Sequence, residues 1–86
     1  MKGKTTRGFK FDIDDKNLDN MELVDCIAEL DENPLLLPKA CDLLLGKEQK
    51  KQLYDHYRAE DGRVPIEDIS HALEEIFNAS NESKNL

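Results

Sequence analysis

The segment from Pro38 to Leu45 is apolar almost all the way round a helix, and Gly46 follows it as a natural helix terminator. A helix that is apolar on every side has to be surrounded by other elements. Residues 38–45 therefore predict a short central helix, buried by the rest of the chain. The ring of Pro38 clashes with the carbonyl group four residues earlier in a regular helix, so we expect a separate turn at residues 34–37.

Three further helices are predicted by apolar residues that recur at every third or fourth position. They cover residues 20–31, 47–58 and 65–77, and their inward stripes are Leu23, Ile27 and Leu30, then Leu53, Tyr54 and Tyr57, then Ile66, Ile69, Leu73 and Ile76. Asp19 and Glu22 stand at capping-box spacing before the first of these helices, which predicts its start.

The start of the chain has the pattern of a β-strand. Apolar residues alternate with charged ones at Phe9, Phe11 and Ile13, so one face of the strand is apolar. A single strand is not stable alone and needs a partner. Residues 1–7 are either the first strand of a hairpin that turns at Arg7-Gly8, or a flexible basic N-terminus. In the second case the strand pairs with another chain. Residues 14–17 are expected to form a loop.

The 86 residues match the size of one small domain. Together the patterns predict a mainly α fold of four short helices, packed as a small bundle with an N-terminal β-strand or hairpin. We expect residues 8–77 to form a single helical domain. Residues 78–86 are polar and contain few apolar side chains, which predicts a disordered tail.

The charge is unevenly distributed along the chain. Four basic residues and no acidic one lie in the first ten positions, so a net charge of −7 leaves −11 for the remainder. Nine carboxylates and one base lie between Asp12 and Glu32. Such a surface repels phosphate groups and argues against nucleic-acid binding. No apolar run approaches the length of a membrane span, which is about 18 residues. We therefore expect a cytoplasmic protein without membrane contact.

Metal binding and catalysis have little support. A calcium loop beginning at Asp12 would have Asn17 and Leu23 where glycine and a bidentate glutamate are needed. Structural zinc sites usually use close pairs of ligands, whereas the cysteines and histidines stand fifteen residues apart, at Cys26, Cys41, His56 and His71. No glycine-rich phosphate loop or nucleophile motif is present. We therefore expect no metal, no cofactor and no enzymatic activity.

Two leucine clusters lie close together, at residues 35–37 and 43–45. Four short helices either bury both clusters in the core or leave an apolar patch, and a leftover patch would mark a groove for a partner. The candidate partner-binding residues are Leu35, Leu36, Leu37, Leu44, Leu45, Tyr54 and Tyr57.

Several stretches resemble a known group of proteins. They are LDNMEL at residues 18–23, NPL at 33–35, LLLGKE at 43–48 and EDGRVP at 60–65, followed by an amphipathic helix. In this order and spacing they resemble the small tail assembly chaperones of long-tailed, siphovirus-type phages and prophages of Gram-positive bacteria. The resemblance extends over roughly residues 8–77. None of these motifs is catalytic or metal-binding, and no residue-level binding map carries over.

The resemblance implies a protein that coats the tape-measure protein in the bacterial cytoplasm, keeps it soluble and helps to recruit tail tube subunits. Such chaperones are absent from the mature virion, and a longer form often arises by frameshifting. Self-association on the client is compatible with this role. The acidic stretch supports an alternative, a small phage-encoded adaptor or inhibitor that binds a host protein by mimicking nucleic acid.

Overall fold

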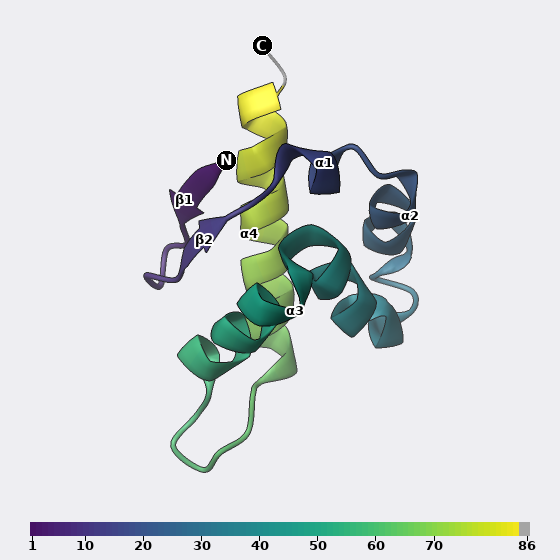
Figure 1. Ribbon diagram of the computed structural model, residues 1–86. Coiled ribbons are helices and arrows are strands. Elements are labelled where there is room, and N and C mark those ends of the chain that lie inside the picture. Colours follow the sequence, from purple (N-terminus) through teal and green to yellow (C-terminus); the bar gives the residue numbers. More distant parts are fainter. Residues whose placement is uncertain (85–86) are drawn as a thin grey trace.

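The computed structural model describes the backbone of residues 1–84 and the side chains of residues 1–80. Its elements, in chain order, are β1 (Lys2–Lys4), β2 (Lys10–Asp12), α1 (Asp15–Leu18), α2 (Met21–Glu29), a short 3-10 helix η1 (Pro34–Leu36), α3 (Leu37–Tyr57) and α4 (Ile66–Lys84). Figure 1 shows α4 running along the molecule, with the hairpin on one side of it and α2 on the other. The prediction of a mainly helical fold with an N-terminal hairpin is confirmed.

The hairpin pairs β1 and β2 in antiparallel register, with Gly3 opposite Phe11. The three apolar residues of the predicted alternation are all buried, namely Phe9, Phe11 and Ile13. The ring of Phe11 packs directly over Gly3, because a Cβ atom at residue 3 would come within 2.5 Å of it. Of the two alternatives for residues 1–7, the first hairpin strand is therefore correct, and the strand pairs within its own chain.

Helix α3 consists of two helices that meet at Gly46, whose φ of 81° and ψ of 164° are not helical. The predicted helix end at Gly46 is thus confirmed, since a positive φ costs glycine little. The break leaves carbonyl groups of the first half without their usual helical donors. Asn17 Nδ2 donates to the carbonyl oxygen of Leu44 at 3.1 Å, and Gln49 Nε2 donates to that of Leu45 at 3.2 Å.

Two side chains of the second half of α3 tie this break to its surroundings. Gln49 Nε2 also donates to the carbonyl oxygen of Asp12 at 2.6 Å. Gln49 Oε1 accepts from the backbone N–H of Asp12 at 2.8 Å. The Gln49 amide therefore acts like a short neighbouring strand along the outer edge of β2. Lys50 Nζ lies 3.0 Å from each carboxylate oxygen of Asp42, so this ion pair spans the two halves of α3.

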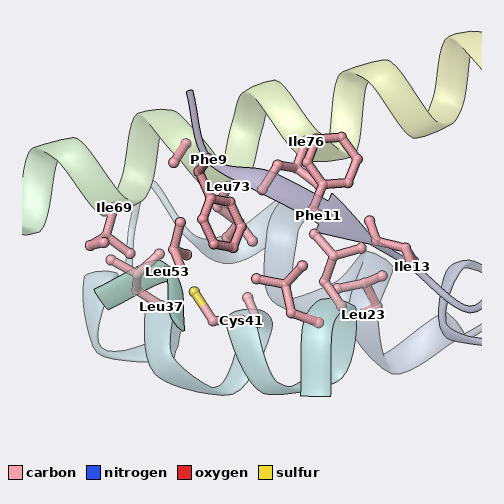
Figure 2. Close-up of a cluster of buried hydrophobic side chains, with 14 of the residues drawn as sticks. Phe9, Phe11, Ile13, Leu23, Leu37, Cys41, Leu53, Ile69, Leu73 and Ile76 are labelled. Atoms are coloured by element: carbon pink, nitrogen blue, oxygen red, sulfur yellow. The ribbon is translucent and has the colours of Figure 1, made fainter. Parts of the chain in front are cut away.

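The core is one cluster, to which β2, α2, both halves of α3 and α4 contribute. Figure 2 shows it as a layer of side chains between α4 and α3, with the aromatic rings of the hairpin inserted between them. The most deeply buried members, with 0% exposure, are Leu23, Ala40, Cys41, Leu44, Leu53, Leu73 and Ile76. The apolar segment before Gly46 is therefore central, as predicted.

Two predictions near the N-terminus need correction. Residues 14–17 are not a loop, because residues 15–17 belong to the single turn of α1 and Asp14 is its N-cap. Asn20, not Asp19, caps α2, and its side chain accepts from the backbone N–H of Glu22 at 3.0 Å. Asp19 is engaged elsewhere, because it ends α1 with its own N–H bonded to the carbonyl oxygen of Lys16.

The prediction of a disordered tail is wrong for residues 78–84, since α4 continues to Lys84. Ser80 extends the buried stripe of this helix and is 1% exposed. Its hydroxyl group donates to the carbonyl oxygen of Ile76 at 2.9 Å, so this polar side chain is satisfied inside the helix. Residues 85 and 86, the rest of the predicted tail, lie outside the described residues.

Replacing Leu73 by alanine should lower the free energy of unfolding by about 2–5 kcal/mol, because a fully buried side chain would leave a cavity. Chemical denaturation measures this change. The neighbouring exposed residue gives a matched control, and Glu74→Ala should change the unfolding free energy by less than about 0.5 kcal/mol. Equal effects of the two substitutions would show that the inward face of α4 is wrongly placed.

Candidate functional site

An apolar groove of about 290 Å³ lies where η1, both halves of α3 and the start of α4 come together. Every side chain along it is a proline, an aliphatic residue or a tyrosine. The lining residues are Pro34, Leu35, Leu37, Pro38, Tyr54, Val64, Ile66 and Ile69. We refer to this feature as the groove.

The helix break at Gly46 creates the groove. Leu37 and Tyr54 stand near opposite ends of α3, yet both line the same hollow. In a continuous helix these two residues would be about 25 Å apart, at a rise of 1.5 Å per residue. Because the chain changes direction at Gly46, the first turn of α3 and its last turns form two walls of one surface feature.

Two large apolar side chains at the groove are left in solvent. Leu35 is 87% exposed and Ile66 is 71% exposed. The tight turn of η1 directs successive side chains to different sides. Leu36 and Leu37 therefore point toward the core, and Leu35 points outward. Ile66 is the first residue of α4 and lies beyond the end of the buried stripe. Fully burying such a side chain is worth about 1.5–3 kcal/mol, so this surface favours a partner.

Tyr54 forms a wall of the groove and is held by charged neighbours behind it. The ammonium group of Lys50 lies 5.9 Å from the centre of the Tyr54 ring while it binds Asp42. Burial raises the pKa of the Tyr54 phenol, and the hydrogen bond to Asp42 raises the pKa of Lys50. The tyrosine therefore stays neutral at physiological pH and adds an amphipathic ring to the groove.

The structure divides the candidate partner-binding residues into three groups. Leu35, Leu37 and Tyr54 line the groove, although Leu37 is only 7% exposed and also belongs to the core. Leu36 is half-buried against the core, and the other three are core residues, namely Leu44, Leu45 and Tyr57. The prediction of a surface role is corrected for these three.

The buried candidates have clear reasons for their positions. Leu44 lies on the fully buried side of the first half of α3, and Leu45, also buried, precedes the break in the same half. The hydroxyl group of Tyr57 shares a buried hydrogen bond of 2.8 Å with Thr5 Oγ1. Sequence reasoning missed Ile66 as a groove residue, because it continues the apolar spacing of α4 and was assigned to the core.

The free thiols have the properties of structural residues. Cys26 and Cys41 are both buried and unpaired. Burial raises the pKa of the Cys41 thiol to about 12, so this side chain is protonated at neutral pH and is a poor nucleophile. Among the side chains of residues 1–80, no group of three or more histidine, cysteine or carboxylate residues could hold a metal ion.

A second exposed apolar patch lies on α2, where Met21 is 67% and Val24 is 40% exposed. Six carboxylates surround this helix between Asp19 and Glu32, and none forms an ion pair within the part of the chain whose side chains are described. The α2 patch is therefore an exposed apolar pair within an acidic surface, unlike the groove, whose lining carries no carboxylate.

Comparison with known proteins adds no relative. No family model matches the chain, and neither the curated proteins nor the solved structures contain a significant match. Within residues 1–84, no helix has the length and apolar character needed to cross a membrane.

Proposed function

We propose that this protein is a tail assembly chaperone of a long-tailed phage or prophage. It binds the tape-measure protein in the bacterial cytoplasm, keeps it soluble and helps to recruit tail tube subunits. The observation that carries the proposal is the groove, where the exposed side chains of Leu35 and Ile66 flank an apolar hollow. The resemblance of residues 8–77 to such chaperones supports the same role.

The walls of the groove favour a helical client segment. They are built by η1, α3 and α4, whose backbone groups mostly bond within their own helices, and Pro34 and Pro38 have no N–H to donate. An extended segment would find few partners here for its own backbone N–H and carbonyl groups. A helix satisfies these groups internally and needs only side-chain contacts.

The charge of the molecule suits a chaperone of an apolar client. A net charge of −7 makes complexes repel one another in solution, and the groove is lined by residues other than Asp and Glu. Binding through the groove requires no catalytic step and no cofactor. Its strength should come mainly from burial of apolar surface, which gives a negative heat-capacity change.

The acidic α2 surface supports a second candidate function. Its carboxylates resemble, in charge alone, the phosphates of a nucleic acid, so an adaptor or inhibitor that binds a basic host protein is the runner-up. Its salt dependence separates it from the chaperone. Raising the salt concentration from about 0.1 M to about 1 M shortens the Debye length from roughly 10 Å to 3 Å, which weakens only ionic contacts.

Co-expression with the tape-measure protein of the same phage or prophage tests the proposal. The two proteins should co-purify at both salt concentrations, and the tape-measure protein should be more soluble than when it is expressed alone. The double variant Leu35→Ser/Ile66→Ser should weaken the complex roughly thirtyfold or more, since it removes about 2–4 kcal/mol of apolar burial.

The control is Met21→Ser/Val24→Ser, which removes an exposed apolar pair from α2 and should bind like the wild type. Both double variants should keep the wild-type unfolding free energy within about 1 kcal/mol, because all four side chains are exposed. Failure of the wild-type proteins to co-purify at either salt concentration would refute the chaperone. Recovery of a basic host protein that salt releases would favour the runner-up.

A further inference from the structure

A second hollow of about 210 Å³ adjoins the groove and differs from it in charge. The two hollows share Pro34, Leu37 and Ile66 as lining residues, so they are neighbours on one surface. The second hollow is also lined by Asp31 and Glu67, which follow α2 and begin α4, respectively. We refer to it as the acidic hollow.

Among the side chains described for residues 1–80, the two carboxylates of the acidic hollow have no basic partner. Neither Asp31 nor Glu67 takes part in an ion pair with the side chains described for residues 1–80. Arg63 lies close to Glu67 in the sequence, but its guanidinium group binds Asp61 at 2.7 Å. Two like charges that line one hollow repel each other and attract a cation that enters it.

From this arrangement we propose that the segment bound in the groove is a helix with a large apolar side chain and, one turn away, a lysine or arginine. The inference rests on the proposed function, because it specifies the client segment of the same site. Side chains three or four residues apart on a helix are neighbours, about 5–6 Å apart between Cβ atoms. The apolar one fills the groove, and the basic one reaches the acidic hollow.

The walls of the acidic hollow fit a long basic side chain. Leu30 and Leu37 supply apolar contact for its methylene groups, while Asp31 and Glu67 receive the charged end. A short neutral side chain gains neither contact, and a carboxylate is repelled. The pair of hollows therefore selects clients by charge as well as by apolar fit.

Labelled alanine-rich peptides of about 18 residues test the inference with the full chain, because even alanine-rich helices shorter than about 12–15 residues are marginal in water. The probes share two leucines on one face of the helix. They differ at a single position, four residues after the first leucine, which carries lysine, glutamine or glutamate. In fluorescence anisotropy, the lysine probe should bind roughly three- to tenfold more tightly than the glutamine probe, as for a partly exposed ion pair. The glutamate probe should bind most weakly.

A double-mutant cycle assigns this preference to the acidic hollow. The double variant Asp31→Asn/Glu67→Gln should abolish the preference for the lysine probe and leave binding of the glutamine probe unchanged. The control Asp25→Asn/Glu29→Gln removes two exposed carboxylates of α2 and should retain it. Three results would each overturn the inference. The wild type binds the lysine and glutamine probes equally, the lysine preference persists in Asp31→Asn/Glu67→Gln, or no probe binds.

Two further outcomes are separable. Sedimentation shows whether a second copy occupies the groove: a wild-type dimer that Leu35→Ser/Ile66→Ser converts to a monomer overturns the inference. Co-purification of the tape-measure protein without a lysine preference overturns the inference alone. A lysine preference without co-purification supports the charge selectivity of the groove and overturns the proposed function alone.

Discussion

The break in α3 at Gly46 is the constraint on which the rest of the structure depends. It lets the apolar first half of α3 lie in the centre, while the second half changes direction and packs its inward side chains, Leu53 and Tyr57, against the core. The carbonyl groups that it frees are bonded by Asn17 and Gln49, and Gln49 also holds the edge of β2. The hairpin and the long helix α4 thus pack around a helix whose end is satisfied by side chains.

The same break joins structure to the proposed function. It brings the first turn of α3 beside Tyr54, and the start of α4 completes the hollow with Ile66 and Ile69. The chain thereby leaves apolar area in solvent. In a domain this small, whose stability depends on nearly all of its apolar residues, this exposure lowers the free energy of unfolding. The proposed binding of an apolar helical client would account for that exposure, and the acidic exterior would help to keep such a complex in solution.

Sequence periodicity predicted most of the fold, because it reports which side of an element faces the core. Phe9, Phe11 and Ile13 show this, as does the helix end at Gly46. Periodicity does not report where the core ends along a helix. Ile66 continues the apolar stripe of α4 in the sequence, but it lies beyond the end of the core and is exposed. Ser80 interrupts the apolar pattern and is nevertheless buried. The groove was therefore only half predictable, since it depends on how distant segments meet.

Methyl NMR of the full chain, titrated with a soluble tape-measure fragment, tests most directly whether the groove is the client site. The methyl signals of Leu35, Val64 and Ile66 should shift or broaden on addition of the fragment. Those of Met21 and Val24 on α2 should not change, because these residues lie outside the groove. Changes confined to the α2 signals, with unchanged groove signals, would contradict the account.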